Sequence, residues 1–234
     1  MKKLLTAMAG ILLVTSINAQ TLEEIVKKYS AANKHDQISA LSTIKISGKM
    51  SMMGMEMPME LWMKKPDKIK SVTDFNGQKM VSAFDGKKGY SINPMTGSTD
   101  PVEMTPEQIK QTQNNNLFQD YLTKYLEEGK LTLVGDDNVN GKPAFKLEAR
   151  LEGDNKLDLF IDKDTYLLLK TSTDINQGGM NMTADSYMTD YTDNDGVFLP
   201  MKTTTSANGM EFTITFDKVE VNVPMADSIF TLKP

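Results

Sequence analysis

Hydrophobic and polar residues alternate along much of the chain, most regularly between residues 44 and 64. Apolar residues fill every second position on both sides of a turn at Gly54, and mostly Lys, Ser and Glu lie between them. A period of two is typical of a strand with one apolar face. The segment predicts a hairpin whose inner face carries Ile44, Ile46, Gly48, Met50, Met52, Met55, Met57, Met59, Leu61 and Met63.

Similar alternation recurs in two runs, residues 41–92 and 130–221, broken by short turn sequences. Asn76-Gly77, Asn140-Gly141 and Asn208-Gly209 are dipeptides favoured in tight hairpin turns. Successive hairpins without a helix between them indicate antiparallel pairing. We expect roughly eleven strands in the two runs together.

A helical period replaces this alternation at the start of the mature chain. Thr21 and Glu24 have the spacing of a capping box, and an amphipathic stripe follows to about Ala32. His35 comes just after this segment, in a polar run that predicts a solvated loop.

A second helical region lies between the two β runs. Thr105-Pro106 and Gln108 form another helix start, and Gln111–Asn116 interrupts the pattern. An apolar stripe then leads to Gly129, a glycine suited to ending a helix. The stripe consists of Leu117, Tyr121, Leu122, Tyr125 and Leu126. This region would cover the sheet as a fixed plug or as a movable lid.

The order of these elements predicts a mainly β fold with a few α-helices. The simplest arrangement is a half-open antiparallel β-barrel, covered by the N-terminal helix and the central lid helices. No low-complexity linker divides the two β runs, so we expect residues 20–234 to form a single domain.

The first nineteen residues predict a cleavable signal peptide. Lys2 and Lys3 precede the apolar stretch Leu4–Val14, and Ala19 is a small residue suited to cleavage. The stretch is too short to span a membrane comfortably. With no cysteine at the cleavage site, the mature protein should be a periplasmic protein without a lipid anchor of its own.

Composition removes several classes of function. The chain has no cysteine, one histidine and a net charge of −5. Disulfides, thiolate metal sites and histidine-based triads are therefore not expected, and neither is nucleic-acid binding. Asp193-Asn194-Asp195-Gly196 fails the calcium-loop pattern, because Lys202 occupies the position of the bidentate glutamate. We expect neither an enzyme nor a cofactor.

The methionines of the hairpin have three possible roles. Methionine adapts to irregular apolar partners, so the face could hold acyl chains. Its sulfurs are also soft ligands for Cu(I), for which the candidates are Met50, Met52, Met55 and Met57. The third possibility is an ordinary core face, in a structural or sensing domain that binds a partner protein through another surface.

Several segments together resemble the LolA/LolB-type periplasmic carriers, the outer-membrane lipoprotein-sorting family, over nearly all of residues 22–232. Beyond the N-terminal helix, the resemblance lies in Leu61–Lys68, Phe84–Tyr90 with Asn93-Pro94, Phe160–Thr165, Asp190-Tyr191 with Gly196–Pro200, Val219–Asn222 and Asp227–Phe230. It implies a half-open barrel with an apolar cavity for acyl chains. Carriers of this type use a lid arginine, but the one arginine here, Arg150, falls in an expected strand, so that lid mechanism is not carried over.

The first hypothesis is a non-enzymatic periplasmic carrier of lipoprotein acyl chains or another lipid, moving between membrane-associated donor and acceptor proteins. The expected lipid-binding cavity is lined by Met50, Met52, Met55, Met57, Met59, Leu61, Met63, Leu117, Tyr121 and Tyr125. Trp62 falls on the opposite face and is left out of this set.

Overall fold

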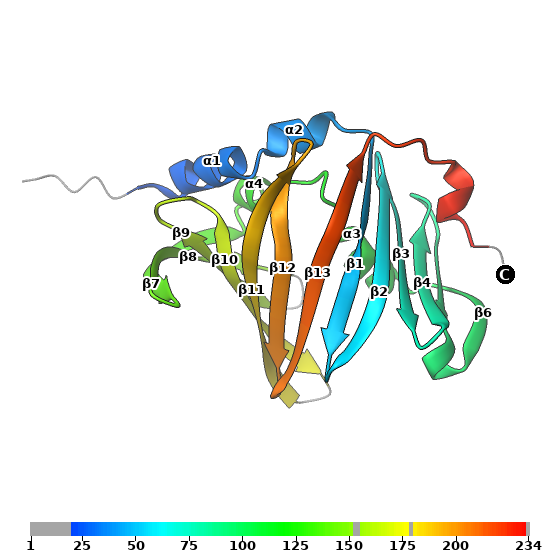
Figure 1. Ribbon diagram of the computed structural model, residues 1–234. Coiled ribbons are helices and arrows are strands. Elements are labelled where there is room, and N and C mark those ends of the chain that lie inside the picture. The colour runs from blue at the N-terminus through cyan, green and yellow to red at the C-terminus, as the bar shows by residue number, and fades with distance from the viewer. Residues whose placement is uncertain (1–19, 152–154, 178–179, 233–234) are drawn as a thin grey trace, which may run out of the picture.

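A single antiparallel sheet organises the computed structural model, which describes residues 20–151, 155–177 and 180–232. The described residues form thirteen strands in the order β6-β5-β4-β3-β2-β1-β13-β12-β11-β10-β9-β8-β7 (Figure 1). The first run contains β1 Thr43–Met52, β2 Met55–Lys64, β3 Lys68–Phe75, β4 Gln78–Phe84, β5 Gly89–Asn93 and β6 Ser98–Glu103. The second contains β7 Leu131–Val139, β8 Lys142–Arg150, β9 Lys156–Asp162, β10 Leu168–Gln177, β11 Met180–Asn194, β12 Val197–Ala207 and β13 Met210–Val221.

The two β runs meet where β1 pairs with β13, so they form one continuous sheet. β6 and β7 are the two ends of this sheet, and it does not close into a full barrel. The expected half-open antiparallel architecture is confirmed. The strand number exceeds the roughly eleven expected, partly because β6 contains Pro101 and lacks clear alternation. Proline is tolerated in an edge strand, where no partner needs its missing N–H.

Four α-helices are present in the described part of the chain: α1 Leu22–Ala32, α2 His35–Ala40, α3 Pro106–Gln113 and α4 Tyr121–Glu127. Both expected capping boxes form, at Thr21 with Glu24 and at Thr105 with Gln108. Leu117 precedes α4 instead of starting it, because Asp120 caps the helix and accepts a hydrogen bond from the Thr123 N–H at 3.1 Å.

The prediction that His35 lies in a solvated loop is wrong. His35 is the first residue of α2, and its ring lies 5.9 Å from that of Tyr29 in α1. The helix is short and buries only Ile38 of its own residues, so its sequence gives little helical periodicity. Docking on the sheet stabilises a segment that has too few residues to be stable alone.

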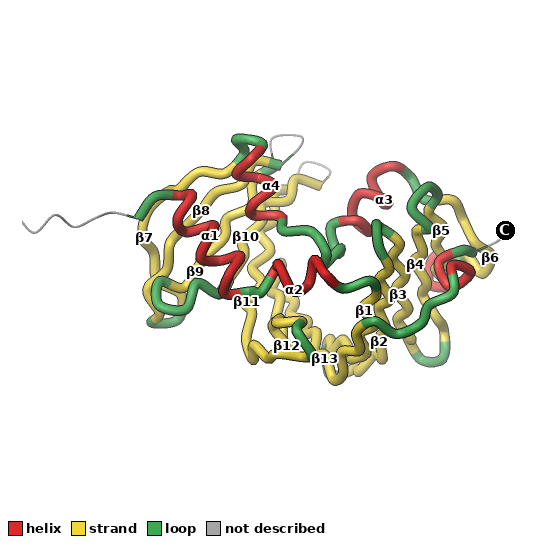
Figure 2. Tube along the Cα trace, turned by 90° about the horizontal axis from the view of Figure 1, so that it is seen from above, coloured by secondary structure: helices red, strands yellow, loops and turns green. Residues whose placement is uncertain are grey.

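The sheet curves around the helices, which lie on its concave side (Figure 2). α1 and α4 pack on β7, β8 and β9, in a buried cluster of Ile25, Val26, Leu122, Leu131, Leu147, Ala149, Leu159 and Ile161. α2 packs over the centre, in a cluster of Ile38, Leu41, Ile44, Ile46, Met63, Ile69, Val197, Leu199 and Val219. α3 lies near β4 and β5 (Figure 2). Within the described residues, no helix is both long enough and apolar enough to cross a membrane.

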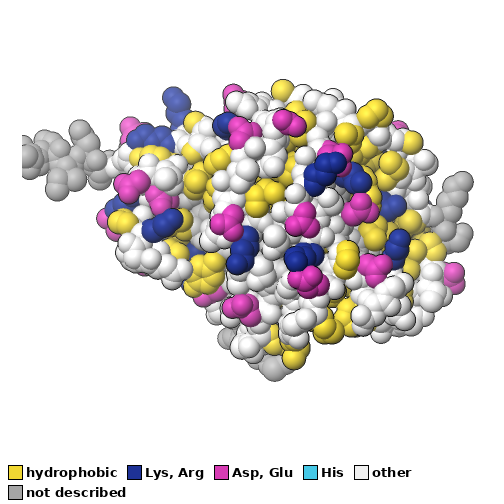
Figure 3. Space-filling view, viewed as in Figure 1, with side chains coloured by type: hydrophobic (Ala, Val, Ile, Leu, Met, Phe, Trp, Pro, Cys, Tyr) yellow, Lys and Arg dark blue, Asp and Glu magenta, His cyan; other side chains and the backbone are white. Residues whose placement is uncertain are grey.

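The convex face of the sheet carries interspersed lysine and acidic side chains (Figure 3). Trp62 belongs to this face, as expected from the alternation, and pairs across the strands with Lys45 and Lys70. The two ammonium groups lie 5.5 and 5.6 Å from the Trp62 ring centroid, within range of a cation–π interaction. The methionines of β2 therefore face the concave side.

Candidate functional site

The register of β1 and β2 gathers five methionines on the concave side. Met50 lies directly opposite Met57, Met52 lies opposite Met55, and Met59 lies opposite Gly48. Directly opposed residues of an antiparallel pair project from the same face, with their Cβ atoms about 4.5–5.5 Å apart. We call these five residues, Met50, Met52, Met55, Met57 and Met59, the methionine face.

Apolar residues of β13 extend this face on its other side. Met50 pairs with Ile214, Met52 pairs with Phe212, and Gly48 pairs with Phe216. The two strands approach closely at Gly48, where an added Cβ would lie 2.2 Å from the carbonyl oxygen of Thr215. The absence of a side chain at Gly48 therefore permits the close approach of β1 and β13.

Burial changes along the hairpin. Near α2, Met63 is fully buried, with an exposed fraction of 0%. Towards the tip, Met50, Met52 and Met59 are half-buried, and Met55 is 39% exposed. Met57 is the exception, with 4% exposed. The end of the face away from α2 is therefore accessible to a ligand, whereas the end under α2 belongs to the core.

Three of the expected cavity residues belong to that core or pack against it. Met63 is a member of the central buried cluster, and Leu61 and Leu117 pack against it. The N–H of Leu117 donates to the sulfur of Met63 at 3.5 Å. Met63 is therefore a packed core residue, whereas Leu61 and Leu117 are half-buried at its edge.

The remaining two expected residues, Tyr121 and Tyr125, lie apart from the methionine face. The Tyr121 hydroxyl donates to the carbonyl oxygen of Gln113 at 2.6 Å, which ties α4 to the end of α3. Burial, with a smaller contribution from Tyr125, raises the pKa of Tyr121 to about 12. Both rings line a pocket of about 530 Å³ between α3, α4 and the end of β8, together with charged side chains such as Lys110 and Arg150.

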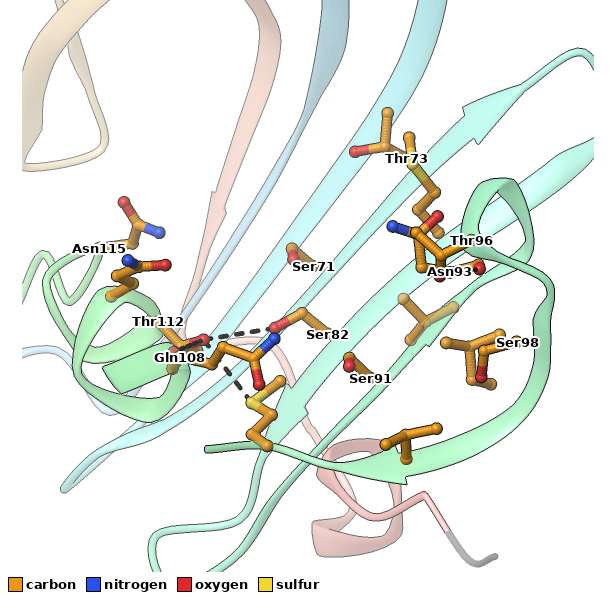
Figure 4. Close-up of a pocket in the computed structure, with 16 residues that line it drawn as sticks. Ser71, Thr73, Ser82, Ser91, Asn93, Thr96, Ser98, Gln108, Thr112 and Asn115 are labelled. Atoms are coloured by element: carbon orange, nitrogen blue, oxygen red, sulfur yellow. Dashed lines mark hydrogen bonds between the residues drawn. The ribbon is translucent and has the colours of Figure 1, made fainter. Parts of the chain in front are cut away.

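A second feature on the concave side is absent from the sequence-based prediction. It is an open pocket of about 590 Å³ between α3 and strands β3–β6, which we call the hydroxyl groove (Figure 4). Its polar lining consists of Ser71, Thr73, Ser82, Ser91, Asn93, Thr96, Ser98, Gln108, Gln111, Thr112 and Asn115. Its apolar lining consists of Met80, Val81, Ile92, Val102 and Met104. None of these residues is charged.

The strand register makes a row of serines across the floor of the groove. Ser71 lies opposite Ser82, and Ser82 lies opposite Ser91. Figure 4 shows these side chains between the strands and α3, where the Ser82 and Thr112 hydroxyls are 3.4 Å apart. The sequence contains each serine, but alternation alone does not predict which serines of different strands become neighbours.

The methionine face and the hydroxyl groove adjoin each other. Met59 lies opposite Thr73 of β3, and Thr73 lies opposite Met80 of β4. One step along, Leu61 lies opposite Ser71. The concave surface therefore changes from thioether and aromatic side chains on β13, β1 and β2 to hydroxyl groups on β3, β4 and β5.

α3 is held over the groove by a close approach to β5. An added Cβ at Gly89 would lie 2.6 Å from the sulfur of Met104 and 3.1 Å from Ile109 Cγ1. The Met104 N–H donates to the carbonyl oxygen of Gly89 at 2.8 Å, fixing the chain just before α3 begins.

Neither protein-family models nor the sequences of curated proteins give a match to the chain. Solved structures do share its fold. A DUF1329 family protein from Desulfovibrio piger is 14% identical, with a TM-score of 0.59, over 88% of this chain and 97% of that one. A LolA superfamily protein from Nitrosomonas europaea is 13% identical, with a TM-score of 0.59, over 91% and 98%. An outer membrane lipoprotein-sorting protein domain from Vibrio parahaemolyticus is 12% identical, with a TM-score of 0.58, over 90% and 97%. The expected resemblance to LolA-type proteins is confirmed at the level of the fold.

Proposed function

We propose that the protein is a non-enzymatic lipid carrier that holds acyl chains against the methionine face. The observation that carries this proposal is the register that places five adaptable apolar side chains on one concave surface, most of them only half-buried. Each methylene group removed from water would contribute about 0.8 kcal/mol. Unbranched thioether side chains can follow a flexible chain without one fixed geometry.

The fold supports the same proposal. The Nitrosomonas europaea and Vibrio parahaemolyticus structures are named for the LolA superfamily and for lipoprotein sorting. A cleavable signal peptide at residues 1–19, which lie outside the described part, would bring the protein to the periplasm. There it would carry lipoprotein acyl chains or another lipid towards the outer membrane, between membrane-associated donor and acceptor proteins.

The test replaces Met52, Met55 and Met59 together by serine. Met57 stays in place because it is buried and its loss would also affect packing. We expect the variant to keep its circular dichroism spectrum and to lose binding of 1-monododecanoylglycerol, measured by isothermal titration calorimetry.

The matched control carries the same substitution at Met53 and Met95, which are 79% and 60% exposed and lie off the methionine face. It should bind as the natural protein does. Equal binding by both variants would refute the assignment of the site, and absence of binding by the natural protein would refute the carrier.

Cu(I) binding is the second candidate, because the register gives Met50–Met57 and Met52–Met55 as two directly opposed pairs. Thioether sulfur is a soft ligand suited to Cu(I). Replacing Met50 and Met57 by leucine keeps the apolar surface but removes two sulfurs. If copper is the cargo, this variant loses Cu(I) in a competition titration. A lipid carrier would keep its acyl binding after the same change.

A further inference from the structure

The composition of the hydroxyl groove differs from that of the rest of the chain. Charged residues make up 24% of the sequence, so about four would be expected among the sixteen residues that line the groove. Within that described lining there are none. Charged residues are usually enriched at accessible surfaces. Their exclusion from an open pocket therefore indicates the chemical class of ligand that the pocket accepts.

The side chains of α3 line two different pockets. Gln108, Gln111 and Thr112 line the hydroxyl groove, with spacings of three and four residues that put them on one helix face. Glu107 and Lys110 line the second pocket, on the other side of the helix. The carboxylate nearest to the groove along this helix is that of Glu107, which accepts from Gln111 Nε2 at 3.4 Å.

The residues that line the groove can both donate and accept hydrogen bonds. Serine and threonine hydroxyls donate and accept, and asparagine and glutamine amides do the same through separate atoms. A neutral group with hydroxyl, ester or amide functions can therefore be satisfied in many orientations. An ionised carboxylate or ammonium group would be partly removed from water without an opposite charge in the lining, which is unfavourable.

We propose that the hydroxyl groove binds the uncharged polar head of an amphiphile whose acyl chain lies on the methionine face. The inference rests on the proposed carrier function and adds the class of cargo, namely an acyl chain attached to glycerol, a sugar or an amide. The contiguity of the two surfaces through Met59, Thr73 and Met80 supplies the path from chain to head. A volume of about 590 Å³ is within the range of small-molecule sites.

The experiment compares three ligands with the same twelve-carbon chain, each titrated calorimetrically below its critical micelle concentration. These are 1-monododecanoylglycerol, dodecanoate and dodecyltrimethylammonium. The proposal predicts that the glycerol ester binds at least tenfold more tightly than either ion. Equal affinities would overturn the assignment of the groove while leaving the carrier intact. Absence of binding by all three would overturn both proposals.

A charge placed in the groove provides the second measurement. Gln111 is exposed, and α3, whose residues the structure describes throughout, buries none of its side chains, so Gln111→Lys should fold normally. We expect it to bind the glycerol ester at least fivefold more weakly and dodecanoate more tightly. Asn114→Lys, which places the same charge in the second pocket, should leave the order of affinities unchanged. The same response from both variants, or from neither, would contradict the proposal.

Discussion

At the scale of single residues, glycine and methionine have complementary roles in the hairpin. Gly48 lies at a shift of register between β1 and β13, where the Thr215 carbonyl occupies the space that a side chain would need. The neighbouring methionines fill the concave surface around it. Alternation in the sequence predicts Gly48 on the inner face, but the close approach of β13 depends on a partner strand more than 150 residues away in the chain.

Gly48→Ala is predicted to destabilise the sheet. The added Cβ would lie 2.2 Å from a backbone oxygen, and backbone cannot move aside as a flexible side chain can. Overpacking of this kind costs about 1–3 kcal/mol in the free energy of unfolding, measurable by urea denaturation. Ser51→Ala, on the convex side of the same strand, is the control. A Gly48→Ala variant as stable as this control would contradict the close approach of β1 and β13.

Asp227 ties the C-terminal segment to β2 and β3. Its carboxylate lies 2.7 Å from the Lys64 ammonium and 2.8 Å from that of Lys68. Hydrogen bonds to Lys64 and Lys68 lower the pKa of Asp227 from 3.8 to about 2. A lowered pKa means that the folded state favours the ionised carboxylate, so this contribution is present above pH 4 and is lost as the pH falls towards 2.

Asp227→Asn should therefore lower the melting temperature at pH 6. The difference from the natural protein should shrink as the pH falls from about 4 towards the folded-state pKa of about 2, where the Asp227 carboxylate becomes protonated. Added salt at pH 6 should also reduce the difference in melting temperature, because the Asp227 side chain is exposed and salt screens its attraction to the two lysines. A difference that stays the same between pH 6 and pH 2 would show that the carboxylate acts through packing and not through its charge.

At the scale of elements, local signals predict the helix starts well and their packing poorly. Both capping boxes are readable from the sequence because a capping box involves only four successive residues. α2 was not predicted because its stability comes from Ile38 in the central core. The hydroxyl groove was not predicted because it requires α3 to lie beside strands β3–β6, and no periodicity encodes that placement.

The two capping boxes should respond differently to the same change. α1 buries Ile25 and Val26, whereas α3, described in full, buries no side chain. Removing an N-cap costs about 1 kcal/mol. Thr21→Ala should therefore lower the global free energy of unfolding by about that amount. Thr105→Ala should mainly speed hydrogen exchange of the α3 amides, as expected for a locally unstable helix. Equal global effects would mean that α3 is part of the cooperative core.

At the scale of the whole molecule, the sequence predicts the fold class but not how the ten expected cavity residues are distributed in the structure. The expected cavity of ten residues is divided in the structure. One face is formed by Met50, Met52, Met55, Met57 and Met59. Met63 lies in the central core, with Leu61 and Leu117 packed against it. Tyr121 and Tyr125 lie between α3 and α4. The alternation of the hairpin is local and predicts which of its residues share a face, whereas the positions of α2 and α4 over the curved sheet depend on contacts between distant segments.

Nuclear magnetic resonance of methionine methyl groups is the most direct test of the central claim that acyl chains lie on the methionine face. The protein would be labelled with ¹³C at the methyl groups, assigned by single Met→Leu variants and titrated with 1-monododecanoylglycerol. Binding of the acyl chain on this face should shift the methyl signals of Met50, Met52, Met55, Met57 and Met59. Met95, 60% exposed, and Met225, buried near the C-terminus, should not respond. Ligand binding without shifts on the methionine face, or with shifts confined to Met95 and Met225, would contradict this claim.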